Sequence, residues 1–320
     1  MKKIHADNGV EYLISDLIPC THAFATRNGG VSRLPETSSL NLAFGRGDTE
    51  DVVLRNLTLF GEAVEFNPRS VISLRQLHSP NVRIVTGQDA GLGYYRSCPD
   101  GADGYATVVN GITLGVKSAD CVPILLCAVG ADGQAYAAAA IHAGWRGTVA
   151  RIAERGVEAL LSLGAAPGDI RAAIGPAIGK CCFEIGSDVR DEIEQRLGCG
   201  VCERFVWPAE AELNGGVEES SGMYTGTDAI IMANDNCAGT VAADVGLCFD
   251  ELKPLKWRAD LKAINAHLLI SAGVRAENID ISDDCTCCLP ELYFSHRRSG
   301  DARGTMLSVI NLTPRRFPGN

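Results

Sequence analysis

The spacing of hydrophobic positions along the chain alternates between the two-residue period of strands and the three-to-four-residue period of helices. Short apolar runs predict strands near residues 12–14, 22–26, 71–74, 82–85, 112–117, 170–174, 279–281, 292–295 and 306–310. Helical spacing predicts helices over about 48–64, 148–162, 187–197 and 257–272. Gly-rich stretches at 91–100 and 214–226 predict surface loops. Because the short strands do not alternate regularly with helices, the pattern favours an α+β fold of mixed sheets flanked by helices, in a single domain over residues 1–320.

Two further apolar runs flank Gly130-Ala131-Asp132-Gly133 and predict a β-hairpin. If Ala131 and Asp132 form its loop, Cys121 lies directly opposite His142. If Asp132 and Gly133 form it, the two are diagonal neighbours. Both registers place them on one face, because only an odd shift would separate them. The hairpin alone therefore predicts a thiol and an imidazole that can share one small ion.

An open zinc site typically has three protein ligands and a fourth position for water or substrate. The histidines that can complete it are His5, His22, His78, His267 and His296. His78 is favoured because it follows the apolar run 71–74, where a strand should emerge into a loop. His5 lies in a polar segment and His267 in a helical pattern, while the pattern leaves His22 and His296 open. A buried structural role for Cys121 and His142 is the simpler alternative.

Several short segments resemble the YfiH-like family, whose members are called laccase-domain proteins, polyphenol oxidases, purine nucleoside phosphorylases and peptidoglycan editing factors. The most specific are Ser118-Ala119-Asp120-Cys121-Val122-Pro123 and His142-Ala143-Gly144-Trp145-Arg146-Gly147, joined by Gln76-Leu77-His78-Ser79 and Gly175-Pro176-Ala177-Ile178-Gly179. The resemblance extends from about residue 20 to about residue 310. It implies a cytoplasmic, single-domain α+β protein that binds one Zn²⁺ through His78, Cys121 and His142.

The resemblance also implies catalysis on purine nucleosides, by phosphorolysis of adenosine, inosine and methylthioadenosine and by deamination of adenosine. We expect a small-molecule nucleoside and phosphate as partners, and Arg27, Arg146 and Arg297 as their contacts. Arg146 precedes the helix expected at 148, and a helix start favours anions. No proton carrier is identified, although Asp120 is a candidate.

Two other activities remain open. One is a peptidoglycan-precursor editing amidase, in which Cys121 acts as the nucleophile with His142 as its base, or a zinc-bound water attacks. The other is a copper-dependent polyphenol oxidase, but six histidines are too few for a multicopper cluster. Because Cu²⁺ outcompetes Zn²⁺ at most N/S sites, we expect copper to be adventitious.

Charge and cysteine content narrow the class of protein further. A net charge of −10 argues against nonspecific binding of nucleic acid. The thirteen cysteines are an odd number, and a polar stretch follows Met1-Lys2-Lys3 instead of a secretory signal, so we expect free thiols in a reducing cytoplasm. No apolar run reaches the roughly 20 residues that span a bilayer.

Cys285-Thr286-Cys287-Cys288 suggests a second metal site, but Cys181 and Cys182 are adjacent and no complementary pair has the usual spacing. We therefore expect Cys287 and Cys288 to be packing residues.

Overall fold

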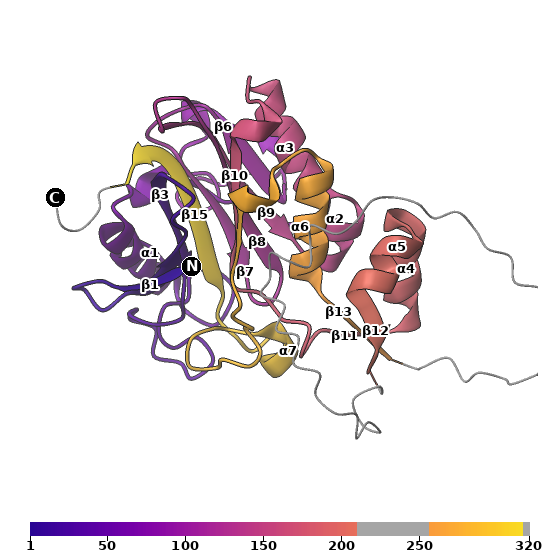
Figure 1. Cartoon of the computed structure of the whole chain (residues 1–320). Helices are drawn as coiled ribbons and strands as arrows, with labels where there is room; N and C mark the ends of the chain where they lie inside the picture. The colour runs from indigo at the N-terminus through magenta and orange to yellow at the C-terminus, as the bar shows by residue number, and fades with distance from the viewer. Residues whose placement is uncertain (210–255, 316–320) are drawn as a thin grey trace, which may run out of the picture.

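Two six-stranded sheets pack against each other at the centre of the computed structural model, which describes residues 1–209 and 256–315 (Figure 1). The loop expected at 214–226 lies outside the described residues. Side chains from both sheets, such as Leu114, Val309, Leu125 and Ala138, share one buried cluster. The mixed sheets and flanking helices confirm the predicted α+β fold.

The first sheet joins strands from both ends of the chain. Its order is β1 (Lys2–His5), β2 (Glu11–Ile14), β3 (Cys20–Ala25), β15 (Met306–Pro314), β7 (Thr113–Ser118) and β4 (Val71–Ile72). β15 is antiparallel to both of its neighbours, β3 and β7. The strand that comes last in the described chain therefore links the N-terminal strands to the middle of the sequence.

The second sheet contains the predicted hairpin at its centre. Its order is β14 (Ile279–Ile281), β10 (Ile170–Ile174), β8 (Val122–Val129), β9 (Ala135–Ala143), β6 (Gly104–Thr107) and β5 (Val82–Ile84). Every residue of β8 is buried, because one face packs on the first sheet and the other on helices. This explains why the sequence of β8 is apolar at consecutive positions.

Helices cover the outer faces of the two sheets (Figure 1). The helix α1 (Glu50–Val64) contributes Val53, Leu57 and Phe60 to the core of the first sheet, as its spacing predicted. The helices α3 (Ile152–Ser162) and α6 (Leu261–Ser271) pack on the outer face of the second sheet. No helix in the described ranges is both long and apolar enough to cross a membrane.

A three-stranded sheet lies to one side, with the order β11 (Glu184–Ile185), β13 (Trp257–Ala259) and β12 (Val206–Pro208). The helices α4 (Ser187–Leu197) and α5 (Cys199–Phe205) lie between β11 and β12 in sequence. The prediction of a helix from residue 257 was wrong at its start, because β13 pairs with both neighbouring strands. The helix begins only after Asp260, whose side chain accepts a hydrogen bond from the Ala263 N–H.

Two further expectations were wrong. The helix predicted over 148–162 is split into α2 (Trp145–Val149) and α3, because the chain turns at Arg151, where φ is 62°. The turn changes the direction of the chain between α2 and α3, and α3 packs on the second sheet. The strand predicted at 292–295 is irregular: Tyr293 and Phe294 are buried without joining a sheet, and α7 (His296–Ser299) follows.

Candidate metal centre and its cavity

His78, Cys121 and His142 come together from three separate segments. One nitrogen of each imidazole and the Cys121 Sγ all lie within 4.8 Å of one another. The Cys121 Sγ is 3.9 Å from His78 Nε2, and the two imidazole rings are 5.0 Å apart with an interplanar angle of 79°. The sequence predicted this juxtaposition, and metal binding itself remains a prediction.

The hairpin register places Cys121 diagonally across from His142. Pro123 pairs with His142 and Val122 with Ala143, so the register with Cys121 directly opposite His142 was wrong and the diagonal alternative is confirmed. The shift originates at the turn, where the Gly130 N–H donates to the Gln134 carbonyl and a bulge interrupts the pairing after Ala128. Both side chains still point to the same face.

Asp103, which the sequence did not single out, organises both halves of the site. Its Oδ1 accepts hydrogen bonds from His142 Nδ1 at 2.9 Å and from the His78 N–H at 2.9 Å. Its Oδ2 accepts from the Leu77 and Ser79 N–H groups and from the Ser79 hydroxyl. The bond to Nδ1 leaves His142 Nε2 directed at Cys121, which is the arrangement that metal-binding histidines commonly have.

The electrostatics couple these groups strongly. Burial on its own would raise the pKa of the Cys121 thiol, but His142 and hydrogen bonds from both histidines lower it to about 6. Burial would lower the pKa of His142, but the Cys121 thiolate and Asp103 raise it to about 9. Burial would also raise the pKa of Asp103, yet hydrogen bonds from His142 and Ser79 lower it to about 2. At neutral pH and without metal, the site therefore holds a thiolate beside an imidazolium.

Gly144 makes room for the three side chains. A Cβ at this position would lie 2.7 Å from His78 Cδ2 and 3.2 Å from the Cys121 Sγ. Because Gly144 has an ordinary extended backbone, with φ −67° and ψ 167°, a turn does not require glycine here. The small residue is needed for the close approach of the side chains.

Asp120 points away from the candidate centre. Its carboxylate accepts hydrogen bonds from the hydroxyls of Thr286 and Ser295 and from the Arg297 N–H, at 2.6, 3.1 and 2.6 Å. The backbone of Asp120 has φ 95°, which turns the chain between β7 and β8. These contacts give Asp120 a scaffolding role instead of the proton-carrier role considered from the sequence.

A cavity of about 660 Å³ opens over His78, Cys121 and His142. Five cationic side chains line it, at Arg46, Arg75, Arg96, Lys117 and Arg303. Phe44, Tyr94 and Tyr95 supply aromatic surface. No Asp or Glu of the described chain belongs to the lining, although the protein as a whole carries a net charge of −10. The cavity therefore concentrates positive charge and favours an anionic ligand.

The arginines predicted as substrate contacts lie outside this lining. Arg27 donates to the carbonyls of Ser38 and Pro290. Arg297 donates to the carbonyls of Cys182 and Glu184, and Arg146 stacks on Trp145. Arg146 lies inside α2 and does not precede a helix, and α2 has only five residues, so the anion-binding helix terminus expected there is absent. Substrate contact by these three arginines remains a prediction.

The other histidines do not join the centre. His22 is buried, accepts the Ser15 N–H at Nε2 and contacts the Cys20 carbonyl. His296 is exposed and contacts the Gly300 carbonyl, His5 pairs with Glu11, and His267 packs on Phe205. The sequence left open which histidine lies beside Cys121 and His142, and in the structure it is His78.

Comparisons with known proteins agree with this architecture. A family model described as multi-copper polyphenol oxidoreductase laccase matches residues 21–211 and 228–313. The chain is 31% identical over 288 residues to purine nucleoside phosphorylase YlmD of Geobacillus stearothermophilus, covering 89% of this chain and 87% of that protein. It is 31% identical over 290 residues to adenosine deaminase RL5 of an unknown prokaryotic organism, covering 90% and 92%. The crystal structure of the hypothetical protein YfiH of Bacillus licheniformis matches with a TM-score of 0.76 and 27% identity, over 97% of this chain and 99% of that one.

Proposed function

The chain belongs to the multi-copper polyphenol oxidoreductase laccase family, to which the YfiH-like proteins also belong, and we propose that it is a zinc-dependent purine nucleoside enzyme. Phosphorolysis of adenosine, inosine and methylthioadenosine is the expected main reaction, with deamination of adenosine beside it. The names of its relatives, purine nucleoside phosphorylase and adenosine deaminase, support this class of substrate. The observation that carries the proposal is a cationic, carboxylate-free cavity over a Cys/His cluster.

The three side chains fit a zinc ion better than a copper cluster. Thiolate and imidazole are both ligands that zinc takes, and three protein ligands leave the fourth position that a catalytic zinc site keeps open. Asp103 supplies the outer hydrogen bond that holds a ligating histidine in place. Among the described residues, the only other Cys/His group suited to a metal contains no histidine. A zinc ion held by His78, Cys121 and His142 would supply Lewis-acid chemistry at the floor of the cavity.

The cavity is suited to phosphate and to a planar base. The pKa of Arg303 is lowered, mainly by burial and next by the positive charge of the nearby Arg46. Two neighbouring guanidinium groups favour a dianionic ligand. Burial lowers the pKa of Lys117 to about 8, and its Nζ donates to the Ser73 carbonyl. We infer that the arginines orient phosphate toward the ribose C1′ and that Lys117 holds a proton which it can release near neutral pH. Tyr94 and Phe44 offer an apolar surface for the purine.

The test is a set of activity assays on zinc-loaded protein. Formation of the free base from inosine or adenosine should require phosphate. Deamination of adenosine to inosine should proceed without phosphate. His78→Ala should lower kcat/KM by about 100-fold or more, because it removes a ligand. Chromatography of the products and zinc analysis of the same samples provide the measurement.

His296→Ala is the matched control, because His296 is an exposed histidine outside the cavity. This variant should retain both zinc and turnover. If His78→Ala loses its zinc and still converts nucleosides at the wild-type rate, the proposed role of the centre is wrong.

The Cys121–His142 pair supports a second candidate, an editing amidase with a thiolate nucleophile. Iodoacetamide separates the two proposals. If zinc occupies the site, Cys121 should be protected in the metal-loaded protein. In the metal-free protein it should be alkylated with a midpoint near pH 6, well below that of an ordinary thiol. Rapid alkylation of Cys121 in the zinc-loaded protein would favour the amidase.

Copper-dependent phenol oxidation is the least supported activity. Only two imidazoles reach the centre within the described part of the chain, and multicopper chemistry needs several more. We expect protein reconstituted with zinc alone to show no phenol oxidation. Oxidation at the level of the copper-loaded protein would contradict this expectation.

A further inference from the structure

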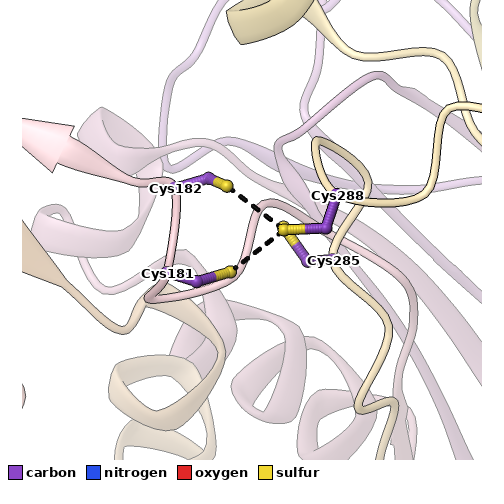
Figure 2. Close-up of side chains that lie close together, drawn as sticks. All are labelled: Cys181, Cys182, Cys285 and Cys288. Carbon is purple, nitrogen blue, oxygen red and sulfur yellow. Dashed lines mark hydrogen bonds between the residues drawn. The ribbon is translucent and has the colours of Figure 1, made fainter.

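Four cysteines form a second thiol cluster, remote in sequence from His78, Cys121 and His142. Cys181 and Cys182 follow β10, and Cys285 and Cys288 follow β14 (Figure 2). The strands β10 and β14 are parallel neighbours in the second sheet, so their carboxyl ends lie at the same edge. The loops that leave these ends therefore meet, although the two pairs are more than a hundred residues apart in sequence.

The sulfur positions suit a single tetrahedral ion. All four Sγ atoms lie within 4.8 Å of one another, with the Cys288 Sγ 3.5 Å from that of Cys181 and 3.3 Å from that of Cys182. Four sulfurs bound to zinc at about 2.3 Å lie about 3.8 Å apart. A disulfide would need about 2.05 Å, and Cys288 could form only one. All four thiols are free in the structure.

The backbone holds the two loops in this position. The Gly179 N–H donates to the Cys285 Sγ at 3.1 Å, and the Thr286 N–H donates to the Ala177 carbonyl. A Cβ at Gly179 would lie 3.1 Å from the Cys285 Cβ and 3.2 Å from the Cys181 Sγ, so glycine permits the approach. Cys285 and Cys288 also have the C-x-x-C spacing common among zinc ligands. The expectation that Cys288 is a packing residue was wrong, because Cys288 is exposed and its sulfur faces the other pair.

We propose that Cys181, Cys182, Cys285 and Cys288 bind one structural zinc ion, distinct from the ion proposed at His78, Cys121 and His142. Four thiolates close the coordination shell and leave no position for a substrate. The ion would fasten the loop after β10 to the loop after β14. Thr286, inside the second loop, donates to Asp120, the residue next to Cys121. The structural ion would therefore stabilise the support of the candidate active site without touching its ligands.

Zinc stoichiometry tests this proposal independently of any enzymatic assay. Protein purified under reducing conditions should contain about two zinc ions per chain when measured by inductively coupled plasma mass spectrometry. Cys288→Ser and His78→Ala should each retain about one, and the double variant almost none. Cys287→Ser is the matched control, because Cys287 lies in the same tetrapeptide but packs on a hydrophobic cluster. It should retain both ions.

If Cys288→Ser fails to fold, cobalt titration of the metal-free wild-type protein replaces it. Saturation at two ions per chain, with strong thiolate-to-cobalt charge-transfer absorption, supports the proposal. Saturation without the strong absorption that four thiolates give, an unchanged zinc content in Cys288→Ser, iron in place of zinc, or a disulfide among the four cysteines in the native protein would each overturn it.

Discussion

Asp103 supports the candidate centre because its two carboxylate oxygens serve different partners. Oδ1 holds the His142 ring and the His78 backbone, while Oδ2 holds the backbone on both sides of His78. One buried side chain thus fixes the tautomer of one proposed ligand and the loop that carries another. The His78 backbone has φ 57°, a conformation that the bonds to Asp103 help to stabilise.

We predict that Asp103→Asn weakens zinc binding about 10- to 100-fold, because the amide NH₂ group would face N–H donors and the His142 orientation would be lost. The free energy of unfolding should fall by about 1–3 kcal/mol. Competition with a chromophoric chelator and urea unfolding provide the two measurements. Asp100→Asn is the control, because Asp100 is exposed and its carboxylate forms only a long ion pair of 3.7 Å with Arg83.

The stability of wild type and that of Asp103→Asn should also depend differently on pH. Since the pKa of Asp103 is lowered from 3.8 to about 2, the carboxylate stabilises the fold fully above its unfolded pKa. This contribution is lost as the pH falls from about 4 toward 2. The stability difference between wild type and Asp103→Asn should shrink as the pH falls through this window. It should also shrink as the pH rises from 6.5 toward about 9, where His142 loses the proton that Asp103 helps to hold. A difference independent of pH would mean that the carboxylate charge is not responsible.

Sequence reasoning identified His78, Cys121 and His142 but not Asp103. The first three have chemistry that metals select, and hairpin periodicity places two of them on one face. Asp103 precedes a short strand that pairs with β9, and only this pairing brings it to His142. Its role depends on a tertiary contact that no local pattern encodes. The signal available was an acidic residue immediately before a strand that is buried throughout.

At the scale of elements, the β8–β9 hairpin determines the positions of Cys121 and His142. The chain that follows β9 must leave the hairpin without obstructing these side chains. Gly144 lies at this exit, directly before α2. Elements with several buried apolar positions, such as α1 and β10, were predicted well from the sequence. Errors arose where sheet pairing decided the conformation, as at β13, or where a buried aromatic segment had no strand partner, as at 292–295.

We predict that Gly144→Ala lowers zinc affinity at least about 10-fold and stability by about 1–3 kcal/mol, because the new methyl group would overlap the His78 ring and contact the Cys121 sulfur. Chelator competition and thermal unfolding measure the two effects. Gly87→Ala is the control, because a Cβ there meets no atom within 4 Å. Wild-type zinc affinity in Gly144→Ala would show that the ligands relax freely around the methyl group.

At the scale of the whole molecule, Asp120 connects the turn between the two main sheets to the segment from Thr286 to Arg297. The partners are separated by more than 160 residues in sequence. This single carboxylate therefore joins the region of the proposed structural zinc to the residue beside Cys121. Sequence reasoning considered Asp120 for proton transfer because it is next to Cys121. Its partners lie too far along the chain for a local pattern to detect them.

We predict that Asp120→Asn lowers the free energy of unfolding by about 2–4 kcal/mol, because the buried donors lose a charged acceptor. Asn tolerates the positive φ at this position, so the change tests the charge and not the backbone. Urea unfolding measures the effect, and the exposed Asp283→Asn serves as the control. Equal stability of the two variants would show that this network contributes little.

The central place of β15 in the first sheet bears on how the protein is made. A ribosome synthesises this strand after every other described element, and Arg303 and Thr305 of the cavity wall are added only just before it. Until β15 has left the exit tunnel, β3 and β7 have no strand between them, and their unpaired N–H and C=O groups remain open to water or to chaperones. The cavity wall that Arg303 and Thr305 contribute can therefore form only after β15 has emerged.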